Sequence, residues 1–207
     1  MTCDKCGYTF MLEVRDQRRA HARWHREWAG GVPLPARLVP TVDDGVVSVT
    51  PQDAASHNRI VTRLARMMGW ENEYDGGLWA GYAAWPQRER VAMYRRDDEA
   101  PLAFLVVRER RAIGLVIVRQ RPVWSRLNIN PDVPKQYDIH GLRRPDVDAV
   151  FVCHDYRRRG IARALIRHIA GYYRISPHEL VWLGELSDAG RALAHNFAAP
   201  NGTFLYG

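Results

Sequence analysis

The residues best suited to bind a phosphate lie in the segment 157–162, which reads Arg-Arg-Arg-Gly-Ile-Ala. A mostly β-branched apolar run, residues 147–152, precedes this segment, and residues 161–169 follow it with apolar side chains at helical period. A strand that enters a helix through a basic loop directs unpaired backbone N–H groups and the positive helix end at one point. Gly160 permits close approach to the backbone. The segment therefore predicts a binding site for a pyrophosphate group.

Four residues near the N-terminus have the types and spacing of a metal site. Cys3 and Cys6 are separated by two residues, and His21 and His25 follow as a second pair separated by three. The cysteines can share a tight turn, and histidines four residues apart project from one face of a helix. Two thiolates and two imidazoles complete the tetrahedral ligand shell that Zn²⁺ prefers. The spacing therefore predicts a zinc site.

The metal site is expected to organise residues 1–31 as a separate finger, because roughly thirty residues bury too little apolar surface to fold alone. Its small core is expected to be formed by Tyr8, Phe10, Leu12, Trp24 and Trp28. The same helix carries five arginines, Arg15, Arg18, Arg19, Arg23 and Arg26. One finger reads only about three base pairs of DNA. We therefore expect any contact with nucleic acid not to be sequence-specific.

In its place between a strand and a helix, the basic loop resembles motif A of the GNAT acetyltransferases, whose signature is Arg/Gln-x-x-Gly-x-Gly/Ala. Arg157, Gly160 and Ala162 match this signature. The resemblance implies an acetyl-CoA donor and the α+β GNAT fold, a mixed, mostly antiparallel central sheet flanked by helices. It also implies a set of cofactor-binding residues: Phe151, Val152, Cys153, Arg157, Arg158, Arg159, Gly160, Ile161 and Ala162. Within this set, a backbone N–H near Cys153 is expected to polarise the thioester carbonyl.

The finger, with Gly30 shortly after it, is similar to the finger that precedes the catalytic domain of the sister-chromatid cohesion acetyltransferases. The strand expected at 46–49, the hairpin expected at 104–118 and the closing segment 190–206 are also similar to that family. This similarity divides the chain into a Cys2His2-type finger at 1–31, a proline-containing linker at 32–44 and an acetyltransferase domain at 45–207.

Two carboxylates are candidates for the catalytic base. In GNAT enzymes the acceptor amine attacks the thioester directly, and a lysine amine, with a pKa of about 10.4, must first lose a proton. The cohesion family carries a catalytic aspartate and a serine at positions that align with Glu185 and Asp148. Glu185 keeps the carboxylate and is the first candidate, with a solvated strand-end acid as the alternative. Asp148, in the central strand, is the second candidate.

Other polar residues have weaker claims to a catalytic role. Cys153 has no identifiable base partner, and buried cysteines are usually inert. Phe197 occupies the position at which many GNAT proteins carry a tyrosine as general acid, so that role falls to Tyr206, to water or to no group. His154 and His195 are spare candidates that are more often structural.

Composition limits the protein's location more than it identifies its substrate. The chain has 207 residues and a net charge of +7, and Lys5 and Lys135 are its two lysines. Neither a run of membrane-spanning length nor a leader pattern is present, so we expect a cytoplasmic protein, or a nuclear one in a eukaryote. Three cysteines favour metal binding or a buried thiol over a disulfide framework.

The sequence thus predicts an acetyl-CoA-dependent N-acetyltransferase with a zinc finger, acting on a lysine of a protein. Two alternatives remain open at this point. One is an acetyltransferase for small amines, for which a docking module would be of little use. The other is a zinc-dependent binding adaptor with a degenerate acetyltransferase fold, which the intact 157–162 loop disfavours.

Overall fold

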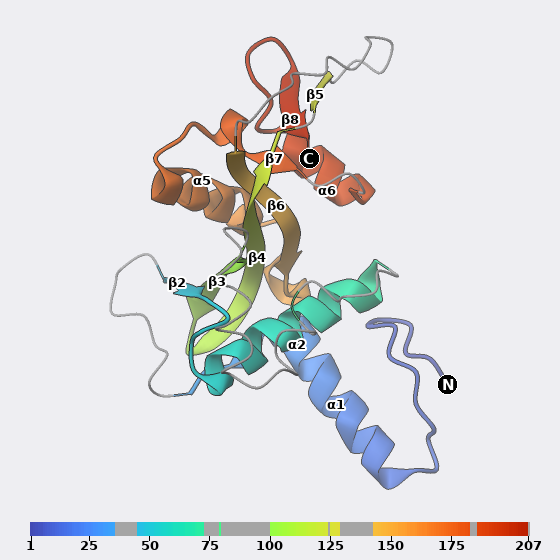
Figure 1. Ribbon diagram of the computed structural model, residues 1–207. Coiled ribbons are helices and arrows are strands. Elements are labelled where there is room, and N and C mark those ends of the chain that lie inside the picture. Colours follow the sequence, from blue (N-terminus) through green and yellow to red (C-terminus); the bar gives the residue numbers. More distant parts are fainter. Residues whose placement is uncertain are drawn as a thin grey trace.

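The computed structural model describes residues 1–35, 45–72, 79, 100–123, 125–128, 143–182 and 186–206 (Figure 1). The elements of the N-terminal half are α1 (Arg15–Gly30), β1 (Val32–Pro33), β2 (Val46–Val49), α2 (Ala55–Glu71), β3 (Leu102–Arg108) and β4 (Arg111–Pro122). Those of the C-terminal half are β5 (Ser125–Asn128), β6 (Arg143–Val152), η2 (His154–Tyr156), α5 (Ile161–Tyr173), η3 (Pro177–Glu179), β7 (Val181–Trp182), α6 (Asp188–His195) and β8 (Thr203–Tyr206).

The strands form one mixed sheet with the order β2-β3-β4-β6-β7-β8-β5, and β1 pairs with β4 outside this path. The neighbours from β2 to β6 are antiparallel, whereas β6–β7 and β7–β8 are parallel. This arrangement confirms the predicted fold class, a mixed and mostly antiparallel sheet flanked by helices. None of the described helices combines the length and the apolar character needed to cross a lipid bilayer.

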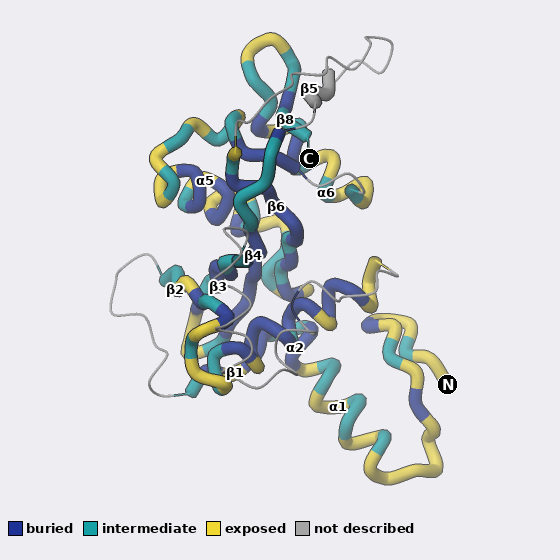
Figure 2. Tube along the Cα trace, in the orientation of Figure 1, coloured by how far each residue is buried: buried dark blue, intermediate teal, exposed yellow. Residues whose placement is uncertain are grey.

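The two faces of the sheet support two hydrophobic clusters. Along β4, Leu115 and Ile117 pack in a cluster with α1 and α2, whereas Val116 and Val118 pack in a second cluster with α5 and α6. This alternation follows from the period of two in a strand, because successive side chains point to opposite faces. Figure 2 shows α2 largely buried, while α1 keeps a long exposed side.

The local patterns located most elements correctly. The strand at 46–49 was predicted with the bounds that the structure has, and the closing segment 190–206 contains most of α6 and the whole of β8. Ser187 caps α6 by accepting a hydrogen bond from the Gly190 N–H. The central strand is longer than predicted. β6 begins at Arg143, because Arg143–Asp146 continues the pairing with β4 beyond the apolar run.

The residues that directly follow the predicted finger are part of the sheet and its core. Val32 and Pro33, which the sequence analysis placed in a linker, pair with Ala112 and Arg111 of β4, and Val32 and Leu34 are buried in the α1–α2 cluster. Trp28 lies in the same cluster, whereas Leu12 is 48% exposed and does not belong to the expected small core. Residues 36–44, the rest of the expected linker, lie outside the described part of the chain, and the division into a finger and a domain stays a prediction.

Candidate functional site

The predicted phosphate loop joins β6 to α5 through backbone conformations that favour glycine. Gly160 has a φ of 78°, and Arg158 is also left-handed with a φ of 61°. The Ala164 N–H donates to the Gly160 carbonyl in the first turn of α5, so the preceding amides have no acceptor within the helix. A Cβ built on Gly160 would meet no atom within 4 Å. The helix end therefore presents free amides beside open space, as an anion site requires.

The side chain of Arg157 folds back onto the protein and stays partly exposed. Its Nε donates to the Val152 carbonyl at 2.8 Å, and its Nη2 contacts both carboxylate oxygens of Glu71, at 2.6 and 2.7 Å. The guanidinium also lies 5.6 Å from the centre of the Phe151 ring. Arg157 therefore shapes the loop, whereas Arg158 and Arg159 are exposed on it.

The edge of β6 next to the loop offers backbone amides on the side of β7. In the described part of the chain, β7 pairs with β6 only at Asp146 and Val147. The sequence analysis expected a backbone N–H near Cys153 to polarise the thioester carbonyl; the N–H of Cys153 itself donates to the Ile113 carbonyl at 2.9 Å and is not available for this role. Because amides alternate along a strand, those of Val152 and Val150 point toward the β7 side. These amides replace that of Cys153 as candidates for polarising the carbonyl.

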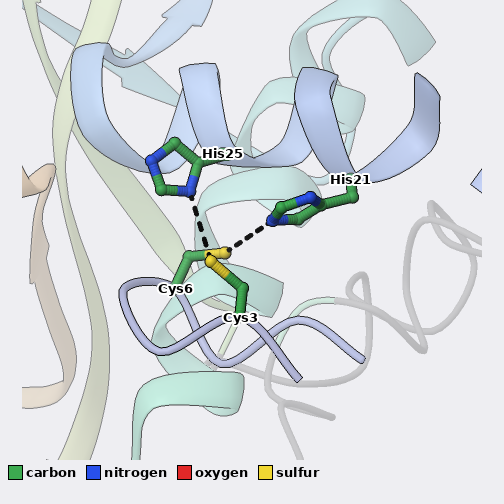
Figure 3. A group of neighbouring side chains, drawn as sticks. All are labelled: Cys3, Cys6, His21 and His25. Atoms are coloured by element: carbon green, nitrogen blue, oxygen red, sulfur yellow. Dashed lines mark hydrogen bonds between the residues drawn. The ribbon is translucent and has the colours of Figure 1, made fainter. Parts of the chain in front are cut away.

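The four predicted metal ligands lie together, although they come from two segments (Figure 3). The Cys3 Sγ is 3.8 Å from the His25 Nδ1, and the Cys6 Sγ is 3.6 Å from the His21 Nε2. All four ligand atoms lie within 4.8 Å of one another. A tetrahedral zinc ion with ordinary bond lengths would separate its sulfur and nitrogen ligands by about 3.6 Å. The donor set and its spacing fit such an ion.

The second catalytic candidate, Asp148, lies in a buried ionic network. Val118 pairs with Val147 and Ile117 pairs with Ala149, so Asp148 is an extra residue in a β-bulge of β6. Its side chain has no exposed surface and lies 2.7 Å from the Arg119 Nε and 3.2 Å from the Arg121 Nη2. These contacts have the distances of ion pairs without the alignment of hydrogen bonds.

A second buried aspartate, Asp146, shares this network. Its Oδ2 is 3.5 Å from the Arg121 Nε, and its side chain also has no exposed surface. Burial, together with the charge of Asp148, raises the pKa of Asp146 to about 7. Burial also raises the pKa of Asp148, and Arg119 and Arg121 oppose that rise. A buried acid in the central strand whose pKa lies near neutrality is typical of a functional site.

The model of the acetyltransferase (GNAT) family matches residues 64–199, which include the phosphate loop and both aspartates. The chain belongs to the GNAT acetyltransferase family. This acetyltransferase therefore uses acetyl-CoA as its donor, and the open helix end at Gly160 is a candidate site for the pyrophosphate of that donor. No curated protein sequence matches the chain at a significant level.

The GNAT fold of this acetyltransferase is also found among solved structures. The chain is similar to the xEco2 acetyltransferase domain bound to a CoA conjugate, with a TM-score of 0.57 and 12% sequence identity; the match covers 78% of this chain and 91% of that one. It also matches a ribosomal-protein-alanine N-acetyltransferase from Brucella melitensis biovar Abortus 2308, with a TM-score of 0.41 and 23% identity over 76% and 92% of the two chains. A GCN5-related N-acetyltransferase from Ralstonia eutropha JMP134 matches with a TM-score of 0.43 and 18% identity over 75% and 94%.

Three other residues were considered for a catalytic role in the sequence analysis. Glu185, the first candidate for the base, lies outside the described residues. Burial raises the pKa of Cys153 to about 12, which agrees with the expectation of an inert thiol. Phe197 is buried and stacks on Trp182 with 6.4 Å between ring centres, so it serves as packing in the GNAT core.

Two residues in contact with the candidate site residues were missed in the sequence analysis. Asp146 had a usable signal, because Asp146 and Asp148 on one strand face Arg119 and Arg121 on its neighbour, each pair two residues apart. Glu71 had none, because it meets Arg157 from 86 residues away in the sequence. Only the folded chain identifies Glu71 as a partner of the cofactor loop.

The raised pKa of Asp146 predicts a pH-dependent stability. The folded state holds the proton up to a pH of about 7, whereas an unfolded chain loses it near the ordinary value of 3.8. The free energy of unfolding should therefore fall between these two values as the pH rises, by at most about 1.4 kcal/mol per pH unit from this one group. Asp146→Asn should lack this contribution, so its stability relative to the wild type should grow up to pH 7 and then level off. Urea unfolding at pH 5, 6, 7 and 8 tests this, and a stability difference that is constant across the series would contradict it.

Proposed function

We propose that this acetyltransferase modifies the side-chain amine of a lysine in a protein substrate. The observation that carries the proposal is the Cys/His finger, whose helix α1 packs against η2 at the start of the cofactor loop. A module of this size beside the donor site suits the docking of a macromolecule, whereas an enzyme for small amines gains little from it. The fold similarity to xEco2, whose bound conjugate joins CoA to a lysine, is compatible with this substrate class.

The reaction follows from direct attack. The lone pair of the neutral amine attacks the thioester carbonyl carbon, the C–N bond forms, and the C–S bond breaks to release CoA as a thiolate that takes up a proton. We propose Glu185 as the base that accepts the amine proton, and Asp148 as the second candidate. Asp148 ranks second because its side chain is fully buried and is paired with Arg119 and Arg121. An amine could reach its carboxylate only after this network opened.

The finger is proposed to hold one zinc ion through Cys3, Cys6, His21 and His25. Burial lowers the pKa of His21, which keeps its imidazole neutral, and backbone amides of Cys6 and Lys5 lower the pKa of the Cys3 thiol, which favours the thiolate. The zinc would be structural, because four protein ligands leave no open coordination position.

Metal analysis of the purified protein should therefore find one zinc per chain. Cys6→Ser should reduce the bound zinc to a trace, because serine is a poor zinc ligand. Cys153→Ala is the matched control, since it removes the third cysteine, which lies outside the four-ligand cluster, and should keep the metal. A wild-type protein without zinc, or an equal loss in the two variants, would contradict the assignment.

A comparison of two classes of acceptor tests the substrate class. The protein is incubated with acetyl-CoA and either a lysine-containing protein digest or a panel of polyamines and aminoglycosides. CoA release and the mass of the products are then measured. Acetylated lysine peptides with no turnover of the small amines are the expected result. Turnover confined to the small amines would overturn the protein-lysine proposal and leave the acetyltransferase activity unaffected.

The exposed side of α1 bears on the partner of the finger. Its five arginines, Arg15, Arg18, Arg19, Arg23 and Arg26, are all exposed. A basic helix face attracts phosphates without reading their order. Contact with nucleic acid that is not sequence-specific therefore remains part of the proposal, as a secondary role of the finger.

A further inference from the structure

The last turn of α1 connects the metal ligands to the cofactor loop. Trp28 lies one turn after His25, and the centres of their rings are 5.6 Å apart. Trp28 is 5% exposed and stacks on His154, two residues after β6 ends, with 4.6 Å between ring centres. A contact on each side places this indole between a metal ligand and the first residue of η2.

Glu71 continues this connection to the loop itself. Its Oε1 accepts a hydrogen bond from the Trp28 Nε1, and its two oxygens hold the Nη2 of Arg157, the first residue of the loop. Arg157 is fixed further by the Val152 carbonyl, and its guanidinium lies 5.8 Å from the centre of the Trp28 ring. One carboxylate thus joins the helix of the finger to the loop that presents amides to the pyrophosphate.

The backbone of the same turn is fixed to the acetyltransferase domain. The Glu27 carbonyl accepts hydrogen bonds from the Gly31 N–H at 2.8 Å and from the Cys153 Sγ at 3.6 Å. Arg111 donates to the carbonyls of Gly30 and Gly31. A Cβ on Gly31 would lie 2.6 Å from the Ala112 carbonyl oxygen, so this close approach requires glycine. A change in the position of the α1 end would therefore reach the cofactor loop.

We propose that Trp28 and Glu71 are positioning residues that couple the metal site to acetyl-CoA binding. This inference rests on the proposed zinc site. The metal ties α1 to the Cys3–Cys6 turn and so fixes the helix turn that carries Trp28. Trp28 and Glu71 then hold Arg157, and with it the left-handed backbone at Arg158 and Gly160. Loss of the metal frees His25, which packs on the Trp28 ring, so Trp28 and Glu71 hold Arg157 less firmly and the loop amides converge less well.

Coupling of this kind must act in both directions. Removing zinc should weaken acetyl-CoA binding by a factor within the usual range of about 5 to 150, and acetyl-CoA should tighten zinc binding by the same factor. Calorimetry on zinc-loaded and chelator-treated protein measures the first effect. Competition with a chromogenic chelator, with and without acetyl-CoA, measures the second on protein that starts zinc-loaded and folded.

Variants isolate the residues that carry the coupling. Glu71→Gln keeps the size but loses the ion pair with Arg157. It should keep one zinc, bind acetyl-CoA about as weakly as the zinc-free wild type, and make that affinity insensitive to zinc. Trp28→Phe keeps the ring stack with His154 but loses the N–H that donates to Glu71. Its acetyl-CoA affinity should lie between that of the wild type and that of Glu71→Gln. Arg23→Gln is the control, because it removes a charge from an exposed position of α1 and leaves the contacts of Trp28, Glu71 and Arg157 in place, and it should behave like the wild type.

Hydrogen exchange provides a structural readout. Amides of residues 154–160 should exchange faster after zinc removal and in Glu71→Gln, and at the wild-type rate in Arg23→Gln. Zinc-loaded protein whose acetyl-CoA affinity and zinc affinity do not respond to each other would overturn the coupling alone and leave the proposed function standing. Protein without any zinc would overturn the metal site and the coupling together.

Discussion

Gly160→Asp should weaken acetyl-CoA binding by more than about tenfold. The substitution forces a side chain into a left-handed backbone conformation, with a φ of 78°, that glycine adopts without cost. It also places a negative charge at the positive end of α5, where the pyrophosphate is expected. Calorimetric titration with acetyl-CoA measures the loss, and thermal unfolding reports separately whether the domain remains folded.

Two further substitutions separate the causes of that loss. Gly160→Ala introduces the backbone strain without the charge, and its Cβ meets no atom within 4 Å, so its loss should be clearly smaller. Arg158→Ala removes a charge but leaves the amides in place. It should cost about fivefold or less, because an exposed ion pair contributes about 1 kcal/mol or less. Equal losses for Gly160→Asp and Arg158→Ala would show that side-chain charge, and not the backbone, binds the cofactor.

The parts of the site that the sequence predicted are the parts encoded locally. The strand–loop–helix unit around Gly160 and the two ligand pairs each depend on a short pattern, β-branched residues, a glycine or a fixed Cys/His spacing, that restricts the backbone where it occurs. The meeting of the two ligand pairs was predicted as well, because a single metal requires all four ligands.

The parts that the sequence did not predict depend on distant contacts. Trp28 has the pattern of a residue in a small finger core, but it packs in the shared cluster because Val32 and Leu34 draw the end of α1 onto the sheet. The bulge that turns Asp148 toward Arg119 arises from the pairing of two strands and leaves no mark on either strand alone. The sequence placed the carbonyl-polarising N–H only near Cys153, because a strand's sequence does not state which neighbour each amide faces.

Glu185→Gln should lower turnover by about 10² to 10⁴ while leaving acetyl-CoA affinity nearly unchanged. Glutamine keeps the size of the side chain but accepts no proton, and a general base contributes about that factor to the rate. The proposed donor site lies at the N-terminal end of α5 and does not depend on this proton transfer. The substitution should therefore change the turnover rate without changing the affinity for acetyl-CoA. The assay needs a lysine peptide that the wild type accepts, with CoA release as the readout.

The pH dependence distinguishes a lost base from a distorted site. A lysine amine has a pKa of about 10.4, so raising the pH supplies more of the neutral amine and should restore part of the activity of Glu185→Gln. Asp148→Asn is the matched variant. It should reduce turnover less than Glu185→Gln, because the wild-type carboxylate is enclosed by Arg119 and Arg121 and is not open to an amine. Full turnover of Glu185→Gln from pH 6 to 9, with a large loss in Asp148→Asn, would move the base to the buried network. Proton transfer would then require the two arginines to release Asp148, and Asp146, with a pKa of about 7, would be the group next to it able to take the proton onward.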